Sequence, residues 1–211
     1  EGLTNPNIPT GDIEVVVEDL VLLNRCDPLP VNTHDEGAES SEEMRLRYRY
    51  LDLRRPSMQH RLARRAKFYK FMRDYMEDHD FIEVTTPILA NSSPEGARDF
   101  LVPSRLHPGQ FYALPQAPQQ FKQLLQVSGF DRYFQIAPCF RDEDLRADRL
   151  LEFYQLDLEM SFVDLRDIQA VGDILMPEMI REFVPDAIIA EDIPHIPFDE
   201  AMLKYGSDKP D

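Results

Sequence analysis

The residues best suited to chemistry in this 211-residue sequence lie in the charged segment 141–149 and directly around it. Arginines and carboxylates are interleaved there, at Arg132, Arg141, Arg146, Arg149, Asp142, Glu143, Asp144, Asp148 and Glu152. Arginine suits phosphate oxygens because its planar guanidinium donates two parallel hydrogen bonds and keeps its charge. The segment is therefore either a platform for a nucleotide triphosphate or a solvated hairpin tip whose charges pair with one another.

Two apolar runs flank this segment and must position it. Residues 133–136 and 153–159 alternate apolar with polar positions and are rich in aromatic and branched side chains. A period of two with this composition is typical of β-strands. The sequence therefore predicts a strand–loop–strand unit with the charged segment as its loop.

Two further candidates lie upstream of that unit. The stretch 91–98 (NSSPEGAR) has the composition of a surface loop, with Glu95 near its centre. Such loops often carry function, although most only connect elements. Lys122 lies among apolar residues in a helix predicted over 116–127. If its ammonium group lies in a pocket, it could hold an anionic ligand.

The other elements follow from the same patterns of apolar spacing and turn residues. Segment 13–23 predicts one or two strands, and the Pro-, Ser- and acid-rich segment 28–44 predicts a linker. Helices are predicted from about Ser40 to Pro56, over 59–80, over 164–184 with Pro177 as a kink or new start, and from 198 to Gly206. Strands are predicted over 81–86, 100–102 and 111–114. The apolar face of 59–80 fits either a core-facing helix or a subunit interface.

Charge is distributed unevenly along the chain. The net charge is −16, yet segment 45–73 contains eleven Lys or Arg residues and one acid, a local balance of +10. This segment could bind a polyanion such as a nucleic acid, or it could pair with the acidic surface of the protein itself.

Composition argues against several classes of protein. No apolar run approaches the length of a membrane span, and EGLTNPNIPT does not resemble a signal peptide. Cys26 and Cys139 have neither disulfide nor metal-site spacing, so we expect two reduced thiols packed as small hydrophobic groups. A cytoplasmic protein is the expectation, with the mitochondrial matrix as the other reducing compartment.

Four motifs together resemble the aspartyl-tRNA synthetase family, in its bacterial type, which mitochondria share. They are YRYLDLRR at 48–55, FIEVTTPIL at 81–89, SPEGARDFLVPSR at 93–105 and FRDEDLRADR at 140–149. The ending YGSDKPD at 205–211 is similar to the same family. The resemblance covers almost the whole chain, and the combination is far more specific than any one motif.

The resemblance implies an α+β fold. Residues 60–211 would form the first part of a class II aminoacyl-tRNA synthetase catalytic core, an antiparallel sheet flanked by helices. Residues 1–27 would be the tail of an anticodon-binding OB barrel, and 28–59 the hinge. The helix and strand over 60–87 are similar to motif 1, which implies a homodimer through this region. Segment 140–159 is similar to motif 2.

The implied reaction joins L-aspartate to tRNA through an aspartyl-adenylate, with ATP and Mg²⁺ as cofactors. By this resemblance the catalytic residue is Arg141, and the ATP contacts are Arg141, Asp142, Glu143 and Phe153. The aspartate contacts are Glu95, Gln119, Lys122, Arg141 and Asp157, with Glu159 beside them. Arg146 and Arg149 would contact the tRNA acceptor end. No protein ligand for Mg²⁺ is assigned within this sequence.

Several positions depart from the family pattern. Leu150-Leu151 stands where the family usually has Gln-Pro, and that Gln contacts ATP; Ala117 stands for a usual Ser in the aspartate pocket. The sequence also contains no Gly-x-Gly-x-Gly-x-Asp-Arg motif 3. We therefore expect a partial enzyme or a degenerate copy. A non-catalytic relative that binds tRNA or a protein, and a ligase acting on asparagine or a free metabolite, are the alternatives.

Overall fold

The structure is a computed structural model, and it describes residues 4–93, 95–145, 149–189 and 193–210. The chain forms two compact units, Glu1–Arg61 and Leu62–Asp211. Each unit is described by itself below. The assignment of 1–27 to an OB barrel and of 28–59 to a hinge stays a prediction.

The first unit is organised around a buried carboxylate. Asp52 is fully buried and accepts from Arg45 Nε at 3.0 Å and Arg49 Nη1 at 2.6 Å, with Arg55 Nη1 at 3.5 Å. Burial disfavours the charged form, but the arginines outweigh it and hold the pKa of Asp52 below its usual value. The YRYLDLRR motif thus contains a charge cluster that fixes the local backbone.

That cluster lies where one continuous helix was predicted. The structure has two short helices, α1 (Glu42–Arg47) and α2 (Arg49–Asp52), separated at Tyr48. Ser41 caps α1, as the sequence predicted, by accepting from the Met44 amide at 3.4 Å. The prediction of an unbroken helix was wrong, because the chain turns at Tyr48 and Asp52 lies among three arginines.

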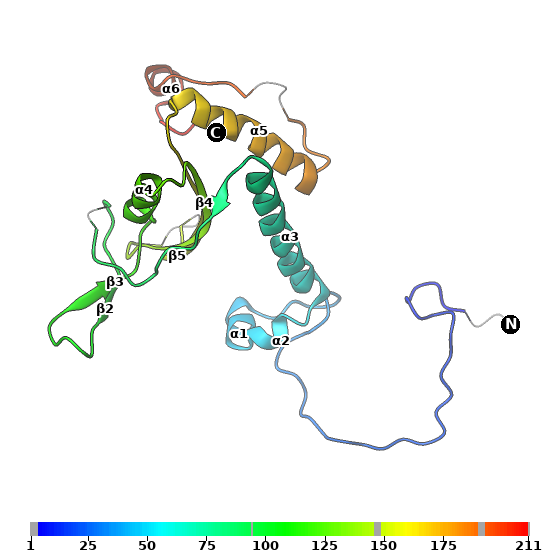
Figure 1. Ribbon diagram of the computed structural model, residues 1–211. Helices are drawn as coiled ribbons and strands as arrows, with labels where there is room; N and C mark the ends of the chain where they lie inside the picture. The colour runs from blue at the N-terminus through cyan, green and yellow to red at the C-terminus, as the bar shows by residue number, and fades with distance from the viewer. Residues whose placement is uncertain (1–3, 94, 146–148, 190–192, 211) are drawn as a thin grey trace. The chain divides into compact units, whose positions relative to one another are not determined.

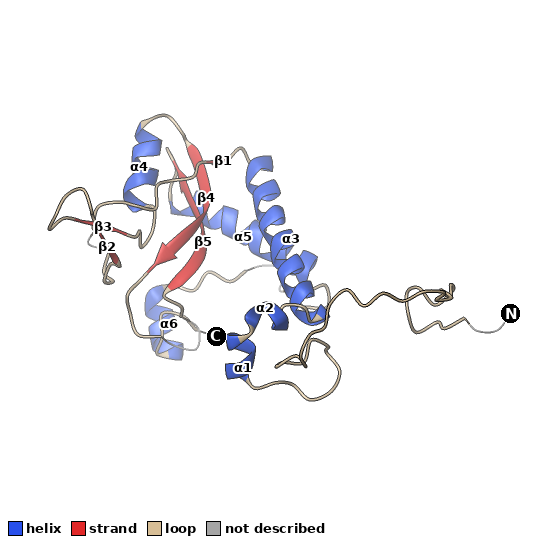
Figure 2. Ribbon diagram, turned by 90° about the horizontal axis from the view of Figure 1, so that it is seen from below, coloured by secondary structure: helices blue, strands red, loops and turns tan. Residues whose placement is uncertain are grey.

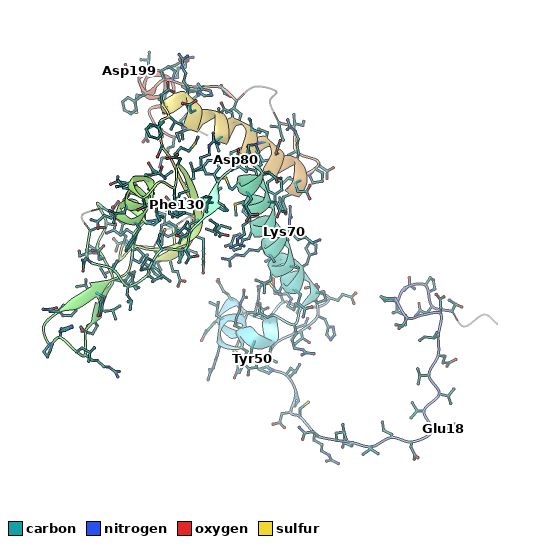
Figure 3. The ribbon with its side chains drawn as sticks, in the orientation of Figure 1. Glu18, Tyr50, Lys70, Asp80, Phe130 and Asp199 are labelled. Carbon is teal, nitrogen blue, oxygen red and sulfur yellow. The ribbon has the colours of Figure 1, made fainter. Side chains whose placement is uncertain are left out.

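The strands predicted in segment 13–23 were also wrong. This segment has no strand, and its apolar side chains are exposed, as at Val16 and Leu23. Figure 3 shows Glu18 on this extended stretch, with few side chains near it. A strand needs a partner for its backbone groups, and no strand is described in the first unit. Cys26 is exposed for the same reason, contrary to the expected packing.

The second unit contains a three-stranded sheet in the order β1 (Ile82–Glu83), β4 (Arg132–Phe140) and β5 (Glu152–Met160), as Figure 1 shows. β4 and β5 pair antiparallel over nine residues, which confirms the predicted strand–loop–strand unit. β1 runs parallel to β4. The sheet is therefore mixed: its β4–β5 pair is antiparallel, as expected, and its β1 edge is parallel.

Helices cover both faces of this sheet. α4 (Gln119–Val127) lies against one face of β4 and β5, and α3 (Pro56–Asp78) and α5 (Leu165–Phe183) lie on the other side, as Figure 2 shows. α5 continues through Pro177, which neither ends nor restarts it. α6 (Phe198–Tyr205) ends at Gly206 in the left-handed conformation, as predicted. β2 (Leu101–Pro103) and β3 (Phe111–Ala113) form the predicted hairpin.

The apolar core lies between the sheet and the helices α3 and α5. Phe134 of β4 is fully buried against Tyr75 and Met76 of α3 and Leu175 of α5, with Leu156 and Leu158 of β5 beside them. Replacing Phe134 by Ala would cost about 3–5 kcal/mol, because transfer energy and packing are lost together. On α4, Leu124 is exposed although it is apolar, and Lys122 is the buried residue of that helix.

Candidate functional site

The second face of the β4–β5 pair is polar, and its residues come from the strand register. Residues directly opposite each other in an antiparallel pair share a face. Tyr133 lies opposite Glu159, Gln135 opposite Asp157 and Cys139 opposite Phe153. The intervening residues form the apolar core face. Alternation along two strands therefore brings the candidate residues of segments 133–139 and 153–159 to one surface.

Lys122 of α4 lies on this polar face and pairs with two carboxylates of β5. Its Nζ lies 2.8 Å from Asp157 Oδ1 and 3.3 Å from Glu159 Oε2, and the Lys122 and Asp157 side chains are each 9% exposed. Burial opposes the charge on Lys122, but the hydrogen bonds and attraction of Asp157 and Glu159 outweigh it, so the pKa of Lys122 is raised. Lys122 is therefore a buried cation held in place by two carboxylates.

A buried glutamine holds the neighbouring loop 91–99. The amide nitrogen of Gln116 donates to Ala97 O at 2.9 Å and to Asp99 Oδ1 at 2.5 Å, and its oxygen accepts from Ala97 N at 3.1 Å. Ser92 also donates to Asp99. Burial favours the neutral acid, yet these hydrogen bonds hold the pKa of Asp99 below its usual value. The loop is therefore anchored at its C-terminal side by a side chain.

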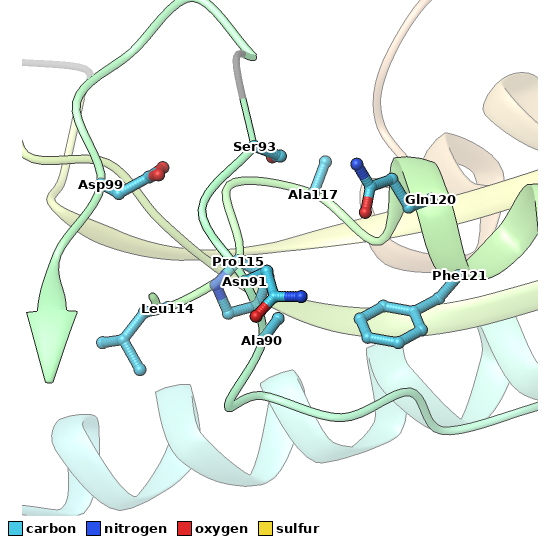
Figure 4. A pocket seen from close by; sticks show the side chains of 9 residues that line it. All are labelled: Ala90, Asn91, Ser93, Asp99, Leu114, Pro115, Ala117, Gln120 and Phe121. Atoms are coloured by element: carbon cyan, nitrogen blue, oxygen red, sulfur yellow. The ribbon is translucent and has the colours of Figure 1, made fainter. Parts of the chain in front are cut away.

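A small pocket lies between this loop and the start of α4. Figure 4 shows Ser93 and Asp99 from the loop on one side, and Ala117, Gln120 and Phe121 on the other. Glu95 is exposed in the same loop. Gln119 begins α4 and is exposed, and in the described part of the chain its side chain has no hydrogen bond. The predicted ligand Gln119 therefore forms no hydrogen bond with the other predicted aspartate contacts in the described part of the chain.

The loop 91–99 is tied to the charged segment that follows β4. Arg98 Nε donates to Asp142 O at 3.0 Å, and Asp142 N donates to Arg98 O at 2.9 Å. Phe140 N also donates to Pro115 O at 2.9 Å. These contacts connect three segments that are far apart in sequence, so the loop, the start of α4 and the motif-2 segment form one continuous surface.

An open recess of about 580 Å³ lies beside this junction. Its lining includes the candidates Arg141, Glu143, Arg149 and Phe153, together with Asp144, Leu150, Leu151 and Lys209. The Arg141 guanidinium lies over the Phe153 ring, 5.0 Å from its centroid. Arg146, a predicted tRNA contact, lies outside the described residues. The recess combines cations with an aromatic face, which suits a nucleotide phosphate and its base.

Three buried polar residues on or beside this face were not among the predicted site residues. They are Gln116, Tyr133 and Gln135. Gln135 Oε1 accepts from Thr86 N and Thr86 Oγ1, each at 3.0 Å, and from Tyr133 Oη at 3.1 Å. The signal for Gln135 was present in the alternation of 133–136, which places a polar residue on the face opposite the apolar one. Gln116 lies outside regular structure, and no periodicity marks it.

Within the described residues, none of the helices is both long and apolar enough to cross a membrane. The same residues contain no group of three His, Cys, Asp or Glu side chains that could hold a metal ion.

Comparison with known proteins identifies the family. The family model described as tRNA synthetases class II (D, K and N) matches residues 41–211. The chain belongs to this family.

Individual relatives of this class II synthetase chain point the same way. It is 59% identical over 208 residues to the aspartate–tRNA(Asp/Asn) ligase of Phenylobacterium zucineum and 58% identical over 208 residues to the aspartate–tRNA ligase of Streptomyces avermitilis. It is 55% identical over 207 residues to the aspartate–tRNA ligase of Exiguobacterium sibiricum. Each match covers 98% of this chain and 35% of the relative, so the chain spans about a third of the length of these relatives.

The fold agrees with a solved synthetase. A crystal structure from Leishmania major Friedlin, described as that of an aspartyl-tRNA synthetase, matches with a TM-score of 0.64 and 24% identity. The match covers 75% of this chain and 32% of the other. The α+β, class II core expected from the sequence is confirmed.

Proposed function

We propose that this chain is the aspartate- and ATP-binding part of an aspartate–tRNA ligase. In the first step an aspartate carboxylate oxygen attacks the α-phosphorus of ATP, the bond to the bridging oxygen breaks, and pyrophosphate leaves with the electron pair. In the second step a terminal ribose hydroxyl of tRNA attacks the adenylate carbonyl, and AMP leaves. The observation that carries the proposal is the single polar face that holds both a buried cation and an arginine–aromatic pair.

The aspartate end of the proposed site centres on Lys122. Its ammonium group is buried and oriented by Asp157 and Glu159, so a side-chain carboxylate arriving there meets a cation that has little freedom to move. Buried, fixed charges interact with ligands more strongly than solvated ones do. Glu95, on the anchored loop 91–99, would accept from the substrate ammonium group. Gln119, exposed at the start of α4, would add a contact from its amide.

The ATP end of the proposed site centres on Arg141 and Phe153. Phe153 offers an aromatic face for adenine, and Arg141 would grip the α-phosphate and the attacking carboxylate, with Asp142 and Glu143 nearby. Holding two anions in line is the main requirement of this step, so positioning and charge stabilisation supply the catalysis. Mg²⁺ would enter with the triphosphate, and no step of this proposal depends on a metal held by these residues.

Two partners complete the proposal. Arg149, with Arg146, would contact the acceptor end of the tRNA, in the cytoplasm where tRNA is charged. A second copy would pair through the 60–87 region, where Arg65 lies over the rings of Tyr69 and Tyr154, 5.1 Å and 5.2 Å from their centroids. The same two aromatic residues line an open, largely apolar groove along α3 and β5.

One observation favours a second function. Leu150 is 68% exposed and lines the recess beside Arg141 and Phe153. The family usually has a glutamine there, and leucine supplies no hydrogen bond to a nucleotide. A non-catalytic, tRNA-binding relative would tolerate this change, whereas a ligase would bind ATP less tightly because of it.

Aspartate-dependent exchange of pyrophosphate into ATP distinguishes the two functions in the complete gene product. A ligase gives exchange, which Arg141→Ala lowers at least 100-fold, while the exposed hairpin variant Arg105→Ala leaves it within twofold. Tight tRNA binding without any exchange would favour the non-catalytic function. Exchange that survives Arg141→Ala would contradict the role proposed for Arg141.

A further inference from the structure

One oxygen of the buried Asp157 carboxylate has no hydrogen-bond partner. Asp157 Oδ1 accepts from Lys122 at 2.8 Å. Asp157 Oδ2 is inaccessible to solvent and has no hydrogen bond of normal geometry to a described residue, although the Tyr133 hydroxyl lies near enough for a weak hydrogen bond toward this carboxylate to help burial raise the pKa of Tyr133. A buried carboxylate oxygen without a donor is unfavourable and uncommon in folded proteins. Asp157 Oδ2 can therefore accept a well-formed hydrogen bond that no described residue gives it.

Tyr133 is the donor best placed to fill it. Its side chain is fully buried, and its hydroxyl donates to Gln135 Oε1 at 3.1 Å. Gln135 lies directly opposite Asp157 in the β4–β5 register, so Tyr133, Gln135 and Asp157 share one face. Burial and, after it, the nearby Asp157 carboxylate raise the pKa of Tyr133, which keeps the phenol protonated and able to donate.

The present acceptor of Tyr133 can release it. Gln135 Oε1 also accepts from Thr86 N and Thr86 Oγ1, each at 3.0 Å. A carbonyl oxygen has two lone pairs, so three donors exceed its capacity, and loss of the Tyr133 bond leaves it satisfied. The Tyr133 hydroxyl therefore has one acceptor, Gln135 Oε1, that keeps two other donors, and a second acceptor, Asp157 Oδ2, that has none of normal geometry.

We propose that Tyr133 is a positioning residue of the aspartate site, whose hydroxyl moves from Gln135 to Asp157 when a ligand carboxylate binds Lys122. This inference rests on the proposed function. A ligand carboxylate draws the ammonium group away from Asp157, and the carboxylate of Asp157 would then be left buried with weakened compensation. A hydrogen bond from Tyr133 to Asp157 Oδ2 replaces the interaction with Lys122 that Asp157 loses. The Lys122 ammonium group can then pair with the substrate carboxylate. Tyr133 itself does not touch the substrate.

The test is Tyr133→Phe in the complete gene product, with Tyr112→Phe on the β2–β3 hairpin as the matched loss of a hydroxyl. We measure KM for aspartate and for ATP separately, by pyrophosphate exchange. Loss of a hydrogen bond to a charged group should raise the aspartate KM of Tyr133→Phe roughly 10-fold. The ATP KM of this variant should stay within twofold of wild type. For Tyr112→Phe, both the aspartate KM and the ATP KM should stay within twofold of wild type. An unchanged aspartate KM, or equal rises for aspartate and ATP, overturns the inference.

Asp157→Asn provides a second test, because the proposal acts through that residue. In the Asp157→Asn background, adding Tyr133→Phe should change aspartate binding by less than twofold; a full 10-fold further loss overturns the inference. If Tyr133→Phe does not unfold cooperatively, Gln135→Leu takes its place, since this substitution removes the group that now accepts the hydrogen bond of Tyr133. An aspartate KM of Gln135→Leu at or below the wild-type value supports the inference. A rise of that KM above twofold overturns it.

The proposed function and this inference fail in different ways. Wild-type protein that gives no aspartate-dependent exchange overturns both. Active wild-type protein with an unaffected Tyr133→Phe variant overturns the inference alone.

Discussion

Lys122 Nζ and Asp157 Oδ1 lie 2.8 Å apart, and each side chain is only 9% exposed. The helix α4 and the strand β5 are thus joined by a buried ion pair on the same face that carries Arg141. A pair in this position is expensive to break, because removal of one partner leaves a buried charge without compensation.

Lys122→Met should therefore destabilise the protein by about 3 kcal/mol. The substitution keeps most of the apolar stem but leaves Asp157 without its ammonium partner. Urea unfolding of the wild-type and variant proteins measures the difference. The matched control is Lys204→Met, which removes the exposed helical pair with Glu200 and should change stability by less than about 0.5 kcal/mol. Equal effects of the two variants would contradict the structural role of Lys122.

Gln116→Leu should release the loop 91–99 without unfolding the sheet. The variant loses three hydrogen bonds to Ala97 and Asp99 and leaves partly buried backbone groups of Ala97 unpaired, at a cost of about 1–3 kcal/mol. Hydrogen exchange of the 91–99 amides should become at least tenfold faster, while exchange in β4 stays unchanged. The exposed α4 variant Gln123→Leu should leave both regions as in wild type. Wild-type rates of hydrogen exchange for the 91–99 amides in Gln116→Leu would show that the Gln116 side chain does not hold the loop.

Ionisation of the Cys139 thiol should make the free energy of unfolding depend on pH in the alkaline range. Burial and, after it, the negative charge of Asp157 raise the pKa of its thiol from 9.0 to about 11. Because the folded-state pKa is raised, the folded protein keeps the proton while the unfolded chain loses it. The free energy of unfolding should therefore fall as pH rises from about 9 to about 11, with little effect below that range.

Cys139→Ala tests this origin. The variant should show a smaller decline in the free energy of unfolding between pH 9 and 11, whereas Cys26→Ala, which changes an exposed thiol, should decline as wild type does. An undiminished slope in Cys139→Ala would assign the alkaline loss to other groups, among them Tyr133.

The 211-residue chain alone should self-associate. β5 is an edge of the three-stranded sheet in the described structure, and Tyr154 and Leu150 on or beside it are 48% and 68% exposed. Open edges with apolar neighbours pair with other chains. Light scattering after gel filtration should give mixed, concentration-dependent masses, reduced by Tyr154→Lys and not by Tyr112→Lys. A monodisperse monomer would contradict this expectation.

The sequence predicted the parts of the fold that depend on local patterns. The alternation of 133–136 and 153–159 predicted two strands, and the polar residues around position 141 predicted their charged loop. Helix and turn signals such as Ser41 and Gly206 act locally and were confirmed. The sequence placed Lys122 among apolar residues, and the structure shows that its side chain is buried.

Features that depend on distant partners could not be predicted in the same way. The parallel pairing of β1 with β4 joins residues about fifty positions apart. The break at Tyr48 accompanies the ion pairs of Asp52 with Arg45, Arg49 and Arg55, which helix propensity does not report. The absence of strands in 13–23 reflects a missing partner, which local propensity does not report. Gln116 was missed because its role comes from hydrogen bonds to Ala97 and Asp99, nineteen and seventeen residues away.

The most direct test of the central claim is an amino-acid screen of ATP–pyrophosphate exchange by the complete gene product. The proposed site, with the Lys122 cation facing the side-chain carboxylate, predicts exchange with aspartate and at least 100-fold less with asparagine, whose neutral amide cannot form that ion pair. Exchange with asparagine at a comparable rate, or with no amino acid at all, would contradict the assignment of this face as an aspartate-activating site.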